Sequence, residues 1–366
     1  MERNELAAWL RLTETPGIGN EGARRLLAAF GLPQAIFEAP ASALREVVPE
    51  AQVQALSSEP EHVAALLEVT IKWLEKADGH HVISLGDDSY PSALYQTADP
   101  PLLLYAQGRI ELLKAASIAI VGSRNPTPQG AANARAFAMH LSRAGLTVVS
   151  GMALGVDAAA HEGGLEGAAG TIAVVGTGLD RVYPRQNRSL AHRIAAGGLV
   201  ISEYPLGTPP LPHNFPKRNR IISGLSRGTL VVEAALQSGS LITARLAGEQ
   251  GREVFAIPGS IHSTLSKGCH ALIKQGAKLV EDAQDIISEL HWGEGRVQGA
   301  AADGPATDGP ADPILDALGH DPMTIDLLAD RTGWPVAELN ARLLELELER
   351  KVARLPGALF QRVIDA

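Results

Sequence analysis

The chain has 366 residues, of which 45% are hydrophobic and 20% charged. This length favours two to four domains, and the composition supplies a sizeable core, which excludes a chain disordered throughout. No apolar run reaches the ~20 residues that span a bilayer, and the N-terminus lacks the features of a secretory signal. A lone cysteine, Cys269, excludes an intrachain disulfide. We therefore expect a soluble, cytoplasmic protein.

Charge is distributed unevenly along the chain. The net charge is -9, but residues 1–114 carry -7, residues 115–290 carry +4 and residues 291–366 carry -6. A protein that binds nucleic acid needs a local basic surface, whatever its total charge. The middle of the chain is therefore the region where a polyanion would bind.

Residues 1–78 have apolar residues at helical spacing and are expected to form a helical domain. Gly17 and Gly19 match G-x-G-x-x-G, but no strand precedes them, so the pattern does not indicate a dinucleotide site. Two interpretations remain open. One is a helix-hairpin-helix-like segment whose glycines let backbone N–H groups contact duplex DNA, and the other is a plain helical turn.

Residues 79–290 alternate short β-rich runs with helical stretches, which predicts a doubly wound, Rossmann-like parallel sheet in an α/β domain. Segments 81–85 and 102–105 are expected to add edge strands. The main strands are expected at residues 117–121, 146–149, 171–175, 199–202, 229–232, 254–257 and 278–280.

Residues 291–312 are rich in Gly, Ala, Pro and Asp and predict a flexible linker. Residues 313–366 follow with three short helices and a hairpin turning at Pro356-Gly357, the pattern of a C-terminal winged-helix domain. The third helix carries four glutamates against two arginines. A DNA-reading helix should be basic, so we expect this domain to be structural or protein-binding.

Three glycine-bearing turns follow predicted strands of the α/β domain. Because the carboxyl ends of parallel strands meet at one edge of a sheet, these turns are expected to converge there. In the first turn, Arg124 could bind a phosphate through two parallel hydrogen bonds. The candidate DNA-binding residues in these turns are Gly122, Ser123, Arg124, Gly151, Gly176, Arg185 and Asn187.

The segment 213–220 combines one aromatic ring with three cations and is the densest candidate cluster. Phe215 could stack on a base, while Lys217, Arg218 and Arg220 could hold phosphates and Asn219 could position them. The following Ile221 and Ile222 show that one face of this helix is core, so not every cation can point into one site.

A last loop on the same edge contains Glu233 and ends at Ser240, whose hydroxyl could contact an anion. Glu233 leaves open an alternative from another class, a nucleotide-processing, phosphoribohydrolase-like enzyme, although no second catalytic acid accompanies it. A third hypothesis is a scaffold that binds only protein. No motif predicts a metal site or a cofactor.

Several motifs, in this order, resemble the DNA processing protein A (DprA/Smf) family. The resemblance covers about residues 80–290, and the flanking regions fit the family's helical and winged-helix domains. The matching segments are Gly122-Ser-Arg124-x-Pro126, Ser150-Gly151-x-Ala-x-Gly155-x-Asp157, Tyr183-Pro184-x-x-Asn187, Phe215-Pro216-x-Arg218-Asn219-Arg220 and Glu233-Ala-x-x-x-Ser238-Gly239-Ser240.

This resemblance implies a non-enzymatic protein that binds single-stranded DNA in a Rossmann-like pocket, forms a homodimer and loads RecA recombinase. Members of the family thereby protect incoming DNA during natural transformation, which takes place in the state of competence. The residues at matching binding positions are Gly122, Ser123, Arg124, Arg185, Phe215, Arg218 and Asn219.

Overall fold

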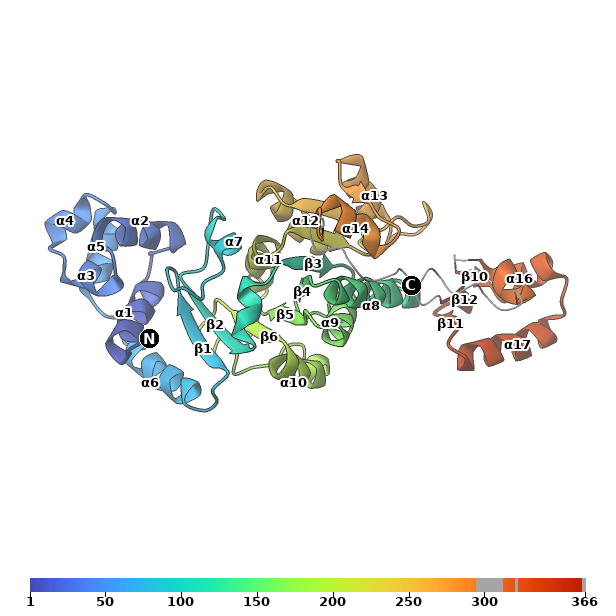
Figure 1. The fold of residues 1–366 in the computed structure, drawn as a ribbon, viewed down its shortest axis with the longest axis horizontal. Coiled ribbons are helices and arrows are strands. Elements are labelled where there is room, and N and C mark those ends of the chain that lie inside the picture. Colours follow the sequence, from blue (N-terminus) through green and yellow to red (C-terminus); the bar gives the residue numbers. More distant parts are fainter. Residues whose placement is uncertain (294–311, 320–321, 364–366) are drawn as a thin grey trace.

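The computed structural model describes residues 1–293, 312–319 and 322–363. Its largest feature is a nine-stranded sheet that runs through the centre of the chain (Figure 1). The strands are β1 (His80–Ser84), β2 (Leu103–Gly108), β3 (Ser117–Val121), β4 (Thr147–Ser150), β5 (Thr171–Val174), β6 (Leu199–Ser202), β7 (Gly228–Val231), β8 (Glu253–Ala256) and β9 (Lys278–Leu279).

The strand order is β1-β2-β6-β5-β4-β3-β7-β8-β9. Strands β3 to β9 pair in parallel, whereas β1 and β2 form an antiparallel edge next to β6. The chain proceeds from β3 to β6 in one direction and then returns to place β7 on the other side of β3. This confirms the doubly wound, Rossmann-like sheet and puts its topological switch point between β3 and β7.

Helices cover both faces of the sheet because its strands are apolar on both sides. One face packs against α8 (Pro128–Arg143), α9 (Val156–Glu166), α10 (Arg188–Gly197) and α14 (Ala283–Glu289). The opposite face packs against α7 (Ser92–Tyr95), α11 (Asn214–Leu225), α12 (Ser240–Glu249) and α13 (Lys267–Lys274). The result is a three-layer domain with buried strands.

The N-terminal helices pack against the antiparallel edge, since their core includes Leu102, Leu103 and Tyr105 at β2. Gly17 and Gly19 lie exposed in the turn between the first two helices, and Gly17 has a positive φ of 78°. The helices are α1 (Arg3–Glu14), α2 (Asn20–Phe30), α3 (Pro33–Glu38), α4 (Ala41–Arg45), α5 (Glu50–Ser57) and α6 (Val63–Leu74).

The C-terminal unit confirms the winged-helix prediction. Three helices pack around their own apolar core, with a three-stranded sheet in the order β10-β12-β11. The predicted linker 291–312 falls almost entirely outside the described residues. The elements are α15 (Pro313–Leu318), β10 (Met323–Thr324), α16 (Ile325–Thr332), α17 (Val336–Leu348), β11 (Val352–Leu355) and β12 (Leu359–Arg362).

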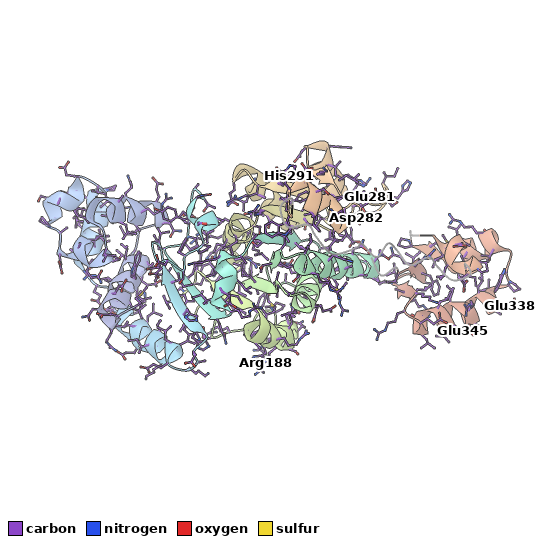
Figure 2. The ribbon with its side chains drawn as sticks, in the orientation of Figure 1. Arg188, Glu281, Asp282, His291, Glu338 and Glu345 are labelled. Atoms are coloured by element: carbon purple, nitrogen blue, oxygen red, sulfur yellow. The ribbon has the colours of Figure 1, made fainter. Side chains whose placement is uncertain are left out.

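Helix α17 is acidic on its outer side, as the sequence predicts; Figure 2 shows Glu338 and Glu345 on this helix. Its buried side is formed by Leu339, Leu343 and Leu346. Across the residues that the structure describes, no helix combines the length and apolarity needed to cross a membrane.

Candidate nucleic-acid interface

The loops that follow β3, β4, β5 and β7 gather at the carboxyl edge of the sheet. In such folds this edge binds ligands at the switch point, where helix N-termini offer free N–H groups to phosphate. Here the switch point lies between the turn after β3 and the loop after β7. What occupies it decides which ligands the edge accepts.

Glu233 fills the switch point. Its carboxylate accepts hydrogen bonds from the Thr127 backbone N–H at 2.9 Å and the Thr127 hydroxyl at 2.6 Å. A side chain at Gly130, in the first turn of α8, would overlap the carboxylate. Burial raises the pKa of Glu233, and the bonds from Thr127 oppose that shift. Glu233 therefore takes the place that a nucleotide phosphate takes in other Rossmann-like folds.

Arg218 is buried, contrary to the free cation that the sequence predicts. Its guanidinium donates to the carbonyl of Gly151 at 2.6 Å and also to that of Val174. Burial lowers its pKa to about 10, the Asp157 carboxylate opposes this shift, and the charge of Arg124 adds to it. Arg218 stays cationic at neutral pH and holds the ends of β4 and β5 in place through these hydrogen bonds.

Arg220 is also drawn into the protein. It forms ion pairs with Glu203 at 2.6 Å and Asp99 at 2.7 Å, and its side chain is only 10% exposed. Burial alone would lower the pKa of Arg220, but the two carboxylates raise it. This network joins α11 to the end of β6 and the loop after α7. Arg220 is therefore not a free phosphate ligand, which corrects its predicted role.

Lys217 is the one cation of this helix segment that faces outward, with a side chain 51% exposed. Its ammonium lies 3.8 Å from Glu203 and 5.8 Å above the Tyr204 ring. Asn219 is half-buried, and its amide donates to the Gly239 carbonyl at 3.5 Å. In this basic run, therefore, Lys217 is available at the surface, whereas Arg218 and Arg220 are buried.

Two further candidates turn inward. The Asn187 amide donates to the carbonyls of Met152 and Ala153 and so holds the loop after β4 in place. Ser240 is buried, and its hydroxyl lies 2.7 Å from that of Ser238. Both residues shape the edge instead of presenting free polar groups, which differs from the sequence expectation.

Phe215 lies at the rim and is half-buried. Its ring sits 5.5 Å from the exposed ring of Tyr183, at an angle of 34°. A side chain at Gly176 would come within 3.1 Å of the Phe215 ring. Phe215 and Tyr183, which we call the ring pair, offer a partly open aromatic surface on which an unpaired base could stack.

Two arginines lie in loops at the same edge, Arg124 after β3 and Arg185 two residues after Tyr183. Arg124 and Arg185 are exposed, and neither forms an ion pair within the described ranges 1–293, 312–319 and 322–363. The Ser123 hydroxyl, next to Arg124, accepts the Asn125 N–H at 3.1 Å. Their exposure leaves both guanidinium groups accessible to a ligand, so their role as phosphate contacts stays a prediction.

Glycines at this edge are required by close packing. A side chain at Gly122 would meet Val156 at 2.8 Å and the Glu233 carbonyl at 3.0 Å, and one at Gly151 would overlap the Arg218 guanidinium. Met152 has a positive φ of 62°, unusual for a residue with a side chain. These glycines let α9 and Arg218 approach the strand ends.

Sequence reasoning missed two features of the site. Tyr183 stands in a motif but was not predicted to contact DNA, although an aromatic residue beside a proline is a usable signal in a chain with only 4% aromatic residues. Sequence reasoning also missed Glu203, whose carboxylate neutralises Arg220; no local pattern links residues from α11 and the end of β6.

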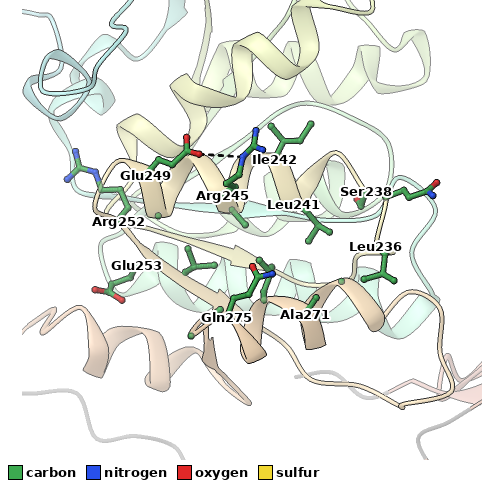
Figure 3. Close-up of a pocket in the computed structure, with 18 residues that line it drawn as sticks. Leu236, Ser238, Leu241, Ile242, Arg245, Glu249, Arg252, Glu253, Ala271 and Gln275 are labelled. Atoms are coloured by element: carbon green, nitrogen blue, oxygen red, sulfur yellow. Dashed lines mark ion pairs between the residues drawn. The ribbon is translucent and has the colours of Figure 1, made fainter.

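The β8–β9 end of the sheet carries a different kind of surface. An apolar groove runs between α12 and α13, lined by Leu236, Leu241, Ile242 and Leu272 with an Arg245–Glu249 ion pair at its margin (Figure 3). Strand β9 ends the sheet there with Leu279 exposed. No group of metal-binding side chains occurs among the described residues.

Comparison with known proteins gives consistent matches. The family model for DNA recombination-mediator protein A matches residues 81–291, and the DprA winged helix domain matches residues 298–358. Protein Smf of Escherichia coli is 43% identical over 80% of this chain and 79% of its own length. DNA processing protein DprA of Streptococcus pneumoniae is 49% identical over 57% of this chain and 74% of its own.

Two solved structures agree with these matches. DNA processing protein A from Streptococcus pneumoniae superposes with a TM-score of 0.67 and 38% identity, covering 79% of this chain and 98% of its own. The Helicobacter pylori protein, described by its single-stranded DNA binding mode, gives 0.52 and 33%, covering 58% and 96%. With the winged-helix end and the edge geometry described above, these matches show that the chain belongs to the DprA/Smf family, the DNA recombination-mediator proteins A.

Proposed function

We propose that the protein binds single-stranded DNA at the carboxyl edge of its central sheet and acts as a recombination mediator. The observation that carries this proposal is the ring pair, Phe215 and Tyr183, flanked by the unpaired, exposed arginines Arg124 and Arg185. A partly open aromatic surface beside exposed cations suits a strand whose bases are unpaired and whose phosphates are accessible. The description of the Helicobacter pylori relative supports the same assignment.

Each part of the strand has a partner in this proposal. A base stacks on the exposed side of the ring pair, while Arg124 and Arg185 contact phosphates on either side of it. Lys217 adds a third positive charge at the surface. Arg218 contributes electrostatically from beneath, since its charge lies near that of Arg124. The glycine turns allow the backbone of the strand to come close to the sheet edge.

The occupied switch point favours a binding protein over the alternative phosphoribohydrolase-like enzyme. A catalytic carboxylate must reach a substrate sugar, but both oxygens of Glu233 accept hydrogen bonds from Thr127. Base release from nucleoside monophosphates, followed by chromatography, tests the alternative. Base release that is lost when Glu233 is replaced would support the enzymatic function over the binding function.

Fluorescence anisotropy with labelled oligo-dT tests the main proposal. On a short oligo-dT of about 5 nucleotides, three phosphate contacts, from Arg124, Arg185 and Lys217, predict a slope of log affinity against log salt of about -2. Affinity for a duplex of the same length should be much lower, because its bases cannot reach the ring pair. Equal affinity for the two forms, or no binding at low salt, would contradict the proposal.

The family resemblance further leads us to propose that the protein forms a homodimer and loads RecA onto the bound strand during natural transformation. The exposed edge strand β9 and the adjoining apolar groove are a surface that a second copy could cover. Sedimentation of the wild type and of Leu279→Arg tests the homodimer. RecA filament formation on strands coated with single-strand-binding protein, with and without this protein, tests loading.

A further inference from the structure

A cavity of about 830 Å³ opens beside the ring pair and extends away from the sheet edge. It lies between α10 and the corner where α6 leads into β1, so two parts of the chain distant in sequence form its walls. Tyr183 and Arg185 belong both to this cavity and to the proposed DNA site. Aromatic and basic side chains line it, among them Trp73, Lys76, Arg188 and His192.

The floor of the cavity is apolar. Met152, Val175, Ala191 and Val200 line it and belong to a buried cluster between α10 and the sheet. An apolar floor below charged walls suits a ligand that is both flat and anionic, as a nucleotide is.

The walls of the cavity are strongly basic. Lys76, Arg185 and Arg188 are exposed and form no ion pair within the part of the chain that the structure describes. Arg188 stands at the start of α10 (Figure 2). The lining carboxylate, Asp180, accepts the Gly207 N–H at 2.8 Å and lies 3.5 Å from Arg181. The free charge of this cavity is therefore positive.

We propose that this cavity holds the continuation of the same DNA strand, beyond the nucleotide stacked on the ring pair. Lys76, Arg188 and His192 contact the next phosphates, and a base lies on the apolar floor. This inference rests on the proposed function, because the strand reaches the cavity past Tyr183 and Arg185. It gives the helical N-terminal region a direct contact with single-stranded DNA, through Lys76 just after α6.

Site sizes of single-strand-binding modules run from about 4 to 16 nucleotides, and oligo-dT probes of about 5 and about 15 nucleotides bracket this range. The double variant Lys76→Ala/Arg188→Ala should bind the long probe about tenfold more weakly, with its salt slope reduced by about 1.4 for two lost phosphate contacts. Binding of the short probe should change less than twofold, because the ring pair alone can hold it.

Arg143→Ala is the matched control, since Arg143 is an exposed arginine in the last turn of α8 that forms no ion pair with any residue the structure describes. It should leave both probes unaffected, and thermal unfolding should show both variants folded. A double variant that binds the long probe as the wild type does would overturn the inference while leaving the proposed function intact. Wild-type protein that binds neither probe would overturn the proposed function itself.

Thymidine monophosphate provides the remaining test. We expect it to displace the long probe only weakly, because the cavity is filled by a strand held at several phosphates. Tight binding of the free nucleotide that is lost in the double variant would show a mononucleotide pocket and would overturn the inference.

Discussion

Helix α11 and the loops after the strands both carry arginines of the kind that bind phosphate, but these arginines differ in burial and in their bonding partners. Arg218 and Arg220 on α11 are buried and bonded to protein groups. Arg124, in the turn after β3, and Arg185, at the start of the 3-10 helix Arg185–Asn187, are exposed and form no ion pair among the described residues. Because the helix packs its apolar face on the sheet, the neighbouring Arg218 and Arg220 are buried as well. A basic run in a packed helix therefore indicates a binding surface less reliably than single arginines in loops do.

The two groups still act together. The charge of Arg124 adds to burial in lowering the pKa of Arg218, so these cations lie close enough to repel each other. A phosphate bound at Arg124 would relieve this repulsion. The buried arginine therefore strengthens the positive potential of the site and at the same time fixes its shape.

The largest expected effect is a loss of stability when the buried Arg218 is replaced. Arg218→Ala leaves Asp157 and two carbonyls without their cationic partner and should lower the free energy of unfolding by about 3 kcal/mol. Urea denaturation measures this, with Arg124→Ala as the control, whose stability should be no lower than that of the wild type. Equal stability of both variants would show that burial does not separate the two arginines.

Loss of the exposed ring should have the next largest effect. Phe215→Ala should weaken oligo-dT binding by about 2 kcal/mol, which is roughly 30-fold, because the stacking surface is lost. The salt slope should not change, since no charge is removed. Phe215→Tyr keeps the ring and should bind nearly as the wild type does. A fall in slope on Phe215→Ala would contradict this separation.

The exposed arginine should show the opposite signature. Arg124→Gln should weaken binding at low salt about tenfold and reduce the salt slope by about 0.7, the value for one phosphate on a single strand. Anisotropy titrations across a salt series give both quantities. An unchanged slope would mean that Arg124 does not contact phosphate.

The smallest predicted effect concerns His161, buried near Arg218. Burial, and secondly the charge of Arg218, lower the pKa of His161 to about 3. The Thr171 hydroxyl donates to the Val148 carbonyl, so Nδ1 of His161 carries the hydrogen and donates to Thr171. The unfolded chain takes up a proton below about pH 6.5, whereas the folded protein does not. Stability should therefore fall as pH drops from 6.5 toward 3.

Comparison of wild type and His161→Asn isolates this contribution, because other titrating groups are common to both. Between pH 7.5 and 5.5 the wild type should lose about 1 kcal/mol more than the variant in urea denaturation. Parallel pH profiles would show that His161 is protonated in the folded protein or does not titrate in this range.

The fold could be predicted largely from sequence because buried parallel strands are short apolar runs. Segments such as 117–121 and 199–202 match β3 and β6 to the residue. The sequence could not specify side-chain exposure within α11. Which of Lys217, Arg218 and Arg220 reaches the surface depends on Glu203, Asp99 and the strand carbonyls, which are distant in sequence.

The same limit applies to Glu233. Its position after β7 indicated a place at the sheet edge, but its pairing with Thr127 depends on how the loops after β7 and β3 meet. A carboxylate that serves a helix terminus and one that serves catalysis have the same local sequence. Only the tertiary contact separates the two.

The Glu233 carboxylate also has a consequence for competition among ligands. Free nucleotides carry the same phosphates and bases as a DNA strand and are far more mobile. With the helix terminus already satisfied by an internal anion, a mononucleotide gains no strong single anchor, whereas a polymer accumulates many modest contacts along the rim. We therefore expect the proposed site to prefer long strands to their building blocks, through a side chain that contacts neither.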